Sequence, residues 1–297
     1  MPPTLSAFLT SDWLPAVRAT IRPTTYVSYE GHVRRYLVPA LGDKRLDEIT
    51  PSDLNRLYAQ LLAKLRPATV RAIHATVRSA LRDAVKWGLL DRNPAERADP
   101  PKQAHAEMTV WTAAELGTFL DKVRDHSLYP LWLTLAMTGL RRGEALGLRW
   151  SDVDLETRRL KVRQTVLHAG SQVIIGQPKT ARGRRVVVID QGTADVLAGM
   201  PRLGELIFCH PDGRNLHPGE VTRTFLTLVD ATGLRRIRLH DLRHTHATLA
   251  LQAGVHPKIV SERLGHSSIA FTLEVYSHAL PSLQEEAAAQ IASLIRD

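Results

Sequence analysis

The residues of this chain that could do chemistry are mostly basic, and one tyrosine accompanies them. His240 and Arg243 lie three positions apart, so a helix would place both on one side of a turn. His266 follows Gly265, a residue type that commonly ends helices, and Tyr276 comes ten residues later. Cationic groups that converge on one place suit a reaction at a phosphate, because they hold the charge that builds up on its oxygens. Each residue alone has a plainer explanation, such as a polar side chain at a helix junction or a tyrosine packed in a core.

Two further candidates come earlier in the chain. Arg141 follows the turn Thr138-Gly139 and precedes Glu144 by three residues, where a surface ion pair of little energy would explain both side chains equally well. Lys179 lies in the polar segment 176–183, between two predicted strands, and we interpret this segment as a hairpin tip. A solvated basic loop is the default explanation for such a lysine.

The elements that must position these residues fall into two groups, and the first hundred residues are predicted to be helical. Thr50 and Pro51 start a helix that should run to about Lys64, because threonine caps helices and proline fits the first helical position. Pro67 opens another helix, which Trp87-Gly88 should end. The apolar stripe of that helix is Val70, Ile73, Val77, Leu81 and Ala84, and an earlier helix should carry Tyr26, Tyr29, Val33 and Tyr36.

Prolines at 94, 100 and 101 interrupt the helical pattern, so we expect an N-terminal domain over residues 1–97, a linker over 98–107 and a second domain over 108–297. In the second domain, Thr112 to Glu115 is a capping box, and 131–137 should be a buried helix. Strands are predicted at 160–162, 172–175 and 186–189, and helices return from 218, with Gly233, Gly254 and Gly265 as stops. The predicted fold is mainly α with a small antiparallel β-sheet, an α+β arrangement.

The composition points to a polyanionic partner. Lys and Arg total 39 against 30 Asp and Glu, which gives a net charge of +9 and a pI of about 10.0. DNA, RNA or an acidic membrane face would suit such a protein. Cys209 is the only cysteine, so no disulfide can form within the chain, as is usual in a reducing cytoplasm. Because neither a signal segment nor an apolar stretch of membrane-spanning length occurs, we expect a soluble, cytoplasmic protein.

In their order and spacing the candidate residues resemble those of the tyrosine recombinases, or phage integrases. The resemblance runs from about residue 5 to the end and rests on Arg141 with Glu144, then Lys179, His240, Arg243, His266 and Tyr276. The sequences Thr-Gly-Leu-Arg-Arg-Gly-Glu, Pro-Lys-Thr, His-Asp-Leu-Arg-His-Thr and Leu-Gly-His-Ser-Ser look like those of phage and mobile-element integrases. Arg142 departs from the pattern, since many members have an aliphatic residue there, and this puts the local packing in question. The resemblance also leads us to expect that the sequence starts at the core-binding domain, without the arm-binding domain that many integrases carry, either because the recombinase is a simpler one or because that domain was trimmed.

The resemblance implies an N-terminal helical core-binding domain and a C-terminal tyrosine-recombinase catalytic domain. Tyr276 would cut DNA to form a 3′-phosphotyrosyl enzyme, and strand exchange would pass through a Holliday junction. Arg141 and Arg243 would clamp the phosphate through paired hydrogen bonds, and His266 would add a donor. Glu144 would orient its neighbours.

The remaining roles concern protons. A tyrosine pKa near 10 calls for help in removing the phenolic proton, and His240 is the candidate base. Lys179 is the candidate acid for the leaving 5′ oxygen. Arg182, Arg184 and Arg185 are poorer rivals, because arginine does not give up its proton. No metal, nucleotide or other cofactor is expected, since the phosphotyrosyl ester retains the bond energy and no phosphate-binding loop motif occurs.

The expected partner is double-stranded DNA, contacted by Arg71, Arg78, Lys179 and Arg182. We expect a homotetramer on DNA and a largely monomeric free protein, with a C-terminal oligomerisation helix over 282–296. We also expect an accessory directionality factor as a partner, a location at the nucleoid of a bacterial host cell, and no membrane partner.

Several alternatives stay open. Within the family, integration or excision of a phage or mobile element competes with resolution of chromosome or plasmid dimers. A non-catalytic DNA-binding protein on the same scaffold is a second alternative, although none of the six catalytic positions is lost. A metal hydrolase could use His240, His244 and His246, but the zincin pattern requires glutamate where Asp241 stands.

Overall fold

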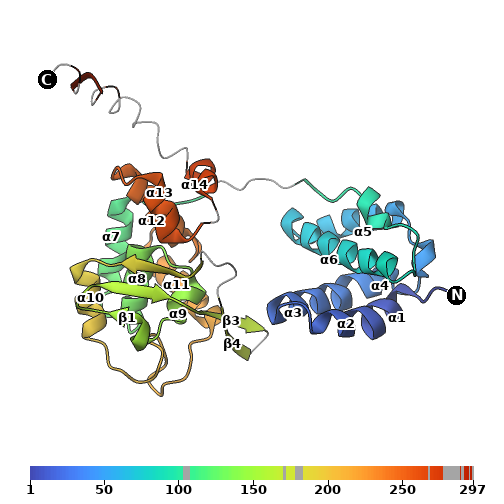
Figure 1. The fold of residues 1–297 in the computed structure, drawn as a ribbon, viewed down its shortest axis with the longest axis horizontal. Helices are drawn as coiled ribbons and strands as arrows, with labels where there is room; N and C mark the ends of the chain where they lie inside the picture. The colour runs from blue at the N-terminus through green and yellow to red at the C-terminus, as the bar shows by residue number, and fades with distance from the viewer. Residues whose placement is uncertain are drawn as a thin grey trace. The chain divides into compact units, whose positions relative to one another are not determined.

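The computed structural model describes residues 1–102, 108–169, 172–177, 183–266 and 268–276, together with residues 288, 291–293 and 295. The chain divides into two compact units, Met1–Glu107 and Met108–Asp297, and each is described here by itself (Figure 1). In these described ranges no helix is both long and apolar enough to cross a membrane.

The N-terminal unit is built from helices. They are α1 (Leu5–Ala7), α2 (Leu14–Arg18), α3 (Pro23–His32), α4 (Val38–Leu41), α5 (Pro51–Leu62) and α6 (Pro67–Lys86). Short π-helical stretches at Phe8–Trp13 and Val33–Leu37 join α1 to α2 and α3 to α4, and 3₁₀ turns lie at Leu46–Glu48 and Pro94–Arg97. The helix predicted from the tyrosine pattern is therefore α3 with its π-helical continuation.

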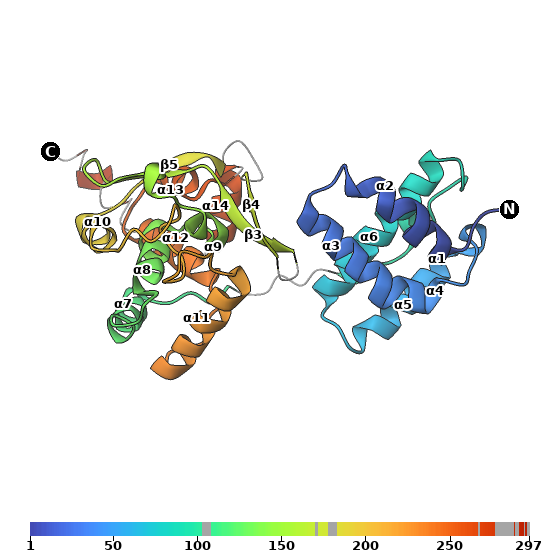
Figure 2. The ribbon, with the colours of Figure 1, turned by 90° about the horizontal axis from the view of Figure 1, so that it is seen from below.

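Helix α6 forms the centre of this unit (Figure 2). All five residues of its predicted stripe are fully buried, which confirms the sequence prediction. A fully buried aliphatic side chain contributes about 1.5–3 kcal/mol, so this stripe is a main source of the unit's stability. Helix α5 begins at the predicted cap, where the Thr50 hydroxyl accepts a hydrogen bond from the Asp53 amide.

The predicted linker starts too early. Ala98 is 8% exposed and belongs to the core of the N-terminal unit. The Asp99 amide donates to the side chain of Asn55 at 2.8 Å, and Arg71 Nη1 donates to the carbonyl of Pro101 at 3.0 Å. The prolines at 100 and 101 end the helical pattern, as predicted, but the chain remains attached to the N-terminal unit as far as Pro101.

The C-terminal unit mixes helices and short strands. Its helices are α7 (Ala113–Lys122), α8 (Tyr129–Thr138), α9 (Arg142–Leu146), α10 (Gln191–Ala198), α11 (Pro218–Thr232), α12 (Asp241–Gln252), α13 (Pro257–Leu264) and α14 (Ile269–Tyr276). Its strands are β1 (Val153–Asp154), β2 (Arg159–Val162), β3 (Thr165–Ala169), β4 (Gln172–Gly176) and β5 (Arg185–Val188). The capping box at Thr112 and the glycine stops at 233, 254 and 265 are confirmed.

The strands form two antiparallel sheets rather than the single sheet expected. One has the order β1-β2-β5, with Leu160 opposite Val187, and the other pairs β3 with β4. Residues 178–182 of the segment interpreted as a hairpin tip lie outside the described residues. The described strands on either side, β4 and β5, belong to different sheets, so they do not form the predicted hairpin. The hairpin in this region is β3–β4, and β3 was absent from the prediction.

Helix α8 lies in the core of the C-terminal unit, with α7, α9, α10 and α12 packed against it. It ends at Gly139, which has a positive φ of 64°. A Cβ atom at Gly139 would lie 2.5 Å from Leu264 Cδ2 and 2.8 Å from His246 Cδ2, so only glycine allows the end of α8 to approach α12 and α13 this closely. This close approach brings the three helices together where the candidate residues lie.

Most of the predicted C-terminal helix 282–296 lies outside the described residues. The described positions 288, 291–293 and 295 are helical, and Ile291 is 57% exposed.

Candidate active site

Arg243 is the most deeply buried of the candidate residues whose side chains the structure describes. It lies in the first turn of α12, and the residue is 3% exposed. Its Nη1 donates to the carbonyl of Gly139 at 2.8 Å, and its Nη2 donates to the carbonyl of Leu264 at 2.7 Å. These carbonyls lie at the C-terminal ends of α8 and α13, where the partial charge of a helix is negative. The two hydrogen bonds fix the plane of the guanidinium between the end of α8 and the end of α13.

Glu144 organises a second cluster at the start of α9. Its side chain is 5% exposed, and Arg141 Nη1 donates to Oε1 at 2.8 Å while the Arg141 amide donates to Oε2 at 3.0 Å. Arg185 Nη2 donates to the same Oε2 at 2.9 Å, from a side chain that is 7% exposed. The surface ion pair considered from sequence is therefore wrong, because this carboxylate is buried between two guanidinium groups.

The charge state of Glu144 follows from these contacts. Burial alone would raise the pKa of its carboxyl, but the ion pairs with Arg185 and Arg141 outweigh burial and hold that pKa below its ordinary value. Glu144 is thus ionised at neutral pH. It orients both arginines, as the resemblance implies.

Arg185 is the residue of this cluster that sequence reasoning undervalued, since it was considered only as a poor proton donor. Besides Glu144 it bonds the carbonyls of Arg263, at 2.6 Å from Nε, and Gly183, at 3.2 Å from Nη1. A signal for this role exists in the sequence. Side chains alternate along a strand, so Arg185 lies on the same face of β5 as Val187, which is 1% exposed.

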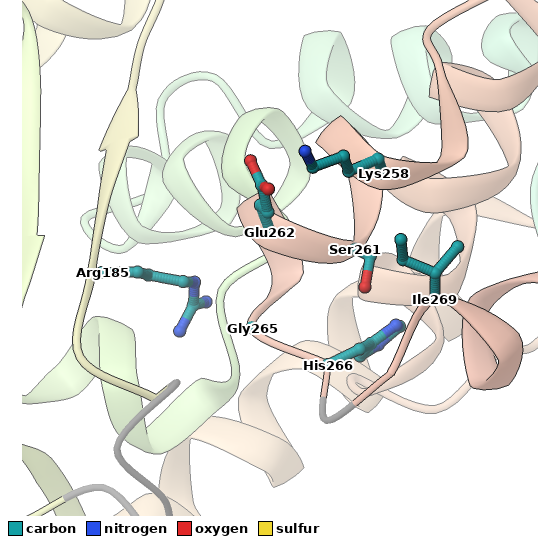
Figure 3. A pocket seen from close by; sticks show the side chains of 7 residues that line it. All are labelled: Arg185, Lys258, Ser261, Glu262, Gly265, His266 and Ile269. Carbon is teal, nitrogen blue, oxygen red and sulfur yellow. The ribbon is translucent and has the colours of Figure 1, made fainter.

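His266 lies on the turn after α13, as its glycine stop predicted. The residue is 8% exposed, and Nδ1 is 2.8 Å from Oγ1 of Thr272 on α14. Burial, together with the positive charges of Arg243 and Arg141, lowers the pKa of His266 to about 3, so its ring is neutral at pH 7. A pocket beside it is lined by Arg185, Lys258, Ser261, Glu262, Gly265, His266 and Ile269 (Figure 3).

His240 immediately precedes α12, and part of its surface is exposed to solvent while the surrounding protein covers the rest. Desolvation of its ring by the surrounding protein, with the charges of His244 and Arg243, lowers its pKa below the ordinary value. A second pocket has Arg141 and His240 in its wall. A neutral imidazole in that position can accept a proton.

The metal-hydrolase alternative finds no support at His246. Its Nδ1 is 2.9 Å from the carbonyl of Ala136, and its Nε2 accepts a hydrogen bond from Arg263 Nε at 3.2 Å. Both ring nitrogens are engaged away from His240 and His244, whose rings meet edge to face. Across the described ranges, no group of three or more His, Cys, Asp or Glu side chains is arranged to hold a metal.

The position of Arg142, where the family pattern was not matched, has a local explanation. Its Nη1 donates to the carbonyl of Pro218 at 2.9 Å and to the hydroxyl of Thr222, so it attaches α9 to the start of α11. Arg142 is therefore accommodated at this position by polar contacts.

The other predicted site residues are placed only in part. Tyr276 is the last residue of α14, and nothing is described of its side chain. Lys179 and Arg182 lie outside the described residues. Arg71 and Arg78 are both exposed on α6, in the N-terminal unit, with His74 between them.

Comparison with protein families matches both units. The phage integrase family covers residues 110–282, and the N-terminal SAM-like domain of phage integrases covers residues 4–62. A tyrosine recombinase XerC-like protein from Caldanaerobacter subterraneus is 28% identical over 94% of this chain and 80% of its own. The ICEBs1 integrase of Bacillus subtilis is 25% identical over 97% of this chain and 82% of its own.

Solved structures show the same fold. The Tn1549 transposon integrase in complex with a circular intermediate DNA has a TM-score of 0.82 at 21% identity and covers 98% of this chain and 99% of its own. A lambda integrase tetramer bound to a Holliday junction has a TM-score of 0.72 at 21% identity, covering 92% of this chain and 77% of its own. Because the family match extends over more than half of the sequence, this chain belongs to the phage integrase family, the tyrosine recombinases.

Proposed function

We propose that this protein is a site-specific DNA recombinase that integrates and excises a phage or mobile element, with Tyr276 as its nucleophile. The observation that carries the proposal is the convergence of Arg141, Arg185 and Arg243 on His266, whose pKa is lowered by burial and by the charges of all three. Glu144 and the carbonyls of Gly139 and Leu264 hold these guanidinium groups in fixed orientations. Fixed cations stabilise the extra charge of a five-coordinate phosphate without reorganising during the reaction. The most similar relatives include phage and mobile-element integrases, which favours integration over dimer resolution.

In the proposed reaction the Tyr276 phenol loses its proton to His240, and the resulting oxygen attacks the scissile phosphorus. Arg141, Arg243 and His266 donate to the non-bridging oxygens, and the P–O5′ bond breaks as Lys179 supplies a proton to the leaving 5′ oxygen. The product is a 3′-phosphotyrosyl ester and a free 5′-hydroxyl. A 5′-hydroxyl from another strand reverses these steps and forms a new phosphodiester, so the bond energy is conserved and the sequence of steps requires neither nucleotide nor metal.

Both units are proposed to bind duplex DNA. On α6, exposed Arg71 and Arg78 are two helical turns apart, and they lower the pKa of His74 between them in addition to the effect of burial. This basic face suits phosphate contacts, and Lys179 and Arg182 would supply further contacts in the second domain. Joined by the segment that follows Pro101, the two units would close around the duplex as a clamp. Affinity should then fall steeply with salt, and fragments 1–100 and 105–297 should each bind far more weakly than the whole chain.

We further propose that four copies assemble on two DNA sites, form a Holliday junction and disassemble to free monomers. The solved lambda integrase tetramer on a Holliday junction supports this assembly by likeness of fold. The helix over 282–296 would dock on a neighbouring copy, and an accessory factor would set direction. The proposed setting is the nucleoid in the cytoplasm of a bacterial host, the source of several relatives. Deleting residues 282–297 should leave binding to one duplex nearly intact and abolish tetramers and recombination in band-shift and strand-exchange assays.

The decisive experiment uses a suicide substrate with a nick next to the scissile phosphate. The short fragment that carries the released 5′-hydroxyl then diffuses away, which traps the covalent product. The wild-type protein should become attached to DNA through Tyr276, and Tyr276→Phe should bind the same duplex without forming an adduct. An adduct with Tyr276→Phe would refute the assignment of the nucleophile. Binding without an adduct in the wild-type protein would favour a non-catalytic DNA-binding protein.

A further inference from the structure

The hydrogen bond between His266 and Thr272 links two parts of the site that the reaction must bring together. His266 lies on the turn after α13, and Thr272 lies on α14, one helical turn before Tyr276. Their side-chain atoms Nδ1 and Oγ1 are 2.8 Å apart. Thr272 is fully buried and His266 is 8% exposed, so water does not compete well for this contact.

The proposed role of His266 requires the proton of its neutral ring to be on one particular nitrogen. Burial and nearby guanidinium groups keep this imidazole neutral, so it carries one N–H and one acceptor nitrogen. The nitrogen that carries the proton is set by the partner of the other nitrogen. A phosphate oxygen that gains negative charge needs a donor from the ring, and Nδ1 is already engaged with Thr272.

We propose that Thr272 is a positioning residue for strand cleavage: its hydroxyl donates to Nδ1 of His266 and so keeps the proton on Nε2, where the ring can donate to the scissile phosphate. The inference rests on the proposed role of His266. Because Thr272 belongs to the helix that carries Tyr276, the ring is held in this orientation only when α14 is docked against the turn after α13. The contact therefore couples the position of the nucleophile helix to the readiness of the phosphate-binding group.

Three variants separate this role from simple packing. Thr272→Val has nearly the same shape and removes the hydroxyl, whereas Thr272→Ser retains it. Thr134→Val is the matched control, because Thr134 is also a fully buried helical threonine, with its hydroxyl bonded to the Pro130 carbonyl at 2.8 Å. Loss of one buried hydroxyl should lower thermal stability similarly in both valine variants, and only Thr272→Val should alter His266.

The first measurement is the tautomer of His266 in the full-length protein, from the ¹⁵N NMR shifts of labelled histidine side chains. His266→Gln identifies the signals. We expect Nε2–H in the wild-type protein and in Thr272→Ser, and a shift towards a mixture of tautomers in Thr272→Val. A hydroxyl that donates to Nδ1 stabilises the neutral ring, so its removal should also raise the pKa of His266. An Nδ1-protonated His266 ring in the wild-type protein would overturn the proposal, and this measurement does not depend on the folding of any variant. A lower pKa of His266 in Thr272→Val than in the wild-type protein would overturn it as well.

The second measurement is the rate of covalent adduct formation on the suicide substrate at saturating protein. Thr272→Val should react about tenfold more slowly, since one donor to a transition-state oxyanion contributes about 100-fold or more and the loosened ring still adopts the productive state part of the time. Thr272→Ser and Thr134→Val should stay within about twofold of the wild-type rate. A wild-type rate in Thr272→Val would overturn the proposal. Normal cleavage by His266→Ala would instead refute the proposed role of His266, while the tautomer set by Thr272 would still be decided by the spectrum.

Discussion

Replacing Arg185 by methionine tests whether the buried ion pair at Glu144 is as desolvated as its geometry indicates. Methionine fills a similar volume and removes the charge, which leaves Glu144 with Arg141, whose side chain is 44% exposed. Removing one partner of a buried ion pair typically costs about 3–5 kcal/mol, because the other charge stays buried with less compensation. For a unit of this size, each kcal/mol of lost stability lowers Tm by about 2–4 °C, so we expect the Tm of the C-terminal unit to fall by roughly 10 °C.

Differential scanning calorimetry of the full chain can follow this change, since the transition of the N-terminal unit should not move. Arg124→Met is the matched control. Arg124 pairs with Asp121 at 3.1 Å, but both side chains are about two-thirds exposed or more, and such pairs contribute less than about 1 kcal/mol. An equal shift in Arg185→Met and Arg124→Met would show that the Glu144 pair is not protected from solvent, and the reasoning would fail.

The pH dependence supplies a second check on the same variant. The wild-type pKa of Glu144 lies below its ordinary value, so the ionised carboxylate contributes stability above the unfolded pKa, and this contribution is lost as pH falls through the folded pKa. The difference in Tm between the wild-type protein and Arg185→Met should therefore be large at pH 7 and shrink below about pH 4.5. A difference that does not change with pH would point to packing rather than charge.

Three other outcomes are expected. Lys179→Ala should cripple cleavage of ordinary DNA but lose much less on a 5′-bridging phosphorothiolate, whose sulfur leaves without a proton; equal losses in a cleavage assay would move the acid role elsewhere. Gly139→Ala should destabilise the C-terminal unit by at least about 2 kcal/mol in calorimetry, because Gly139 has a positive φ and an added Cβ would clash with Leu264. Burial and the charge of Arg263 lower the pKa of His246 to about 4, so stability should decline as pH falls from about 6.5 towards 4, and His246→Gln should flatten that decline in urea titrations.

Local signals in the sequence were sufficient to predict most of the helices that the structure describes. The stripe of α6, the threonine caps of α5 and α7 and the glycine stops of α8, α11 and α13 depend on neighbours within a few residues, so their physics is contained in short windows. The predicted position of His266, after the end of a helix, followed from the same signals.

Strand pairing and the role of Arg185 depend on contacts between distant residues. Segment 176–183 looks like a hairpin tip because strands flank it, but β5 pairs with β2, and β4 pairs with the unpredicted β3. Glu144 and Arg185 are 41 positions apart, and nothing local distinguishes Arg185 from Arg182 and Arg184 except the alternation of β5. Sequence reasoning therefore selected the side chains proposed for catalysis but did not find Arg185, which shares the buried carboxylate of Glu144 with Arg141.

The way Arg243 is held affects how a recombinase of this design can become inactive over evolutionary time. Its guanidinium connects α12 to the ends of α8 and α13, so its loss should destabilise the folded domain as well as remove its proposed contact with the phosphate. A change of Tyr276 to phenylalanine removes a single oxygen at the last residue of α14. Decaying copies of such an element should therefore first lose the tyrosine that we propose as the nucleophile, and keep the arginine for as long as the domain still folds and occupies DNA.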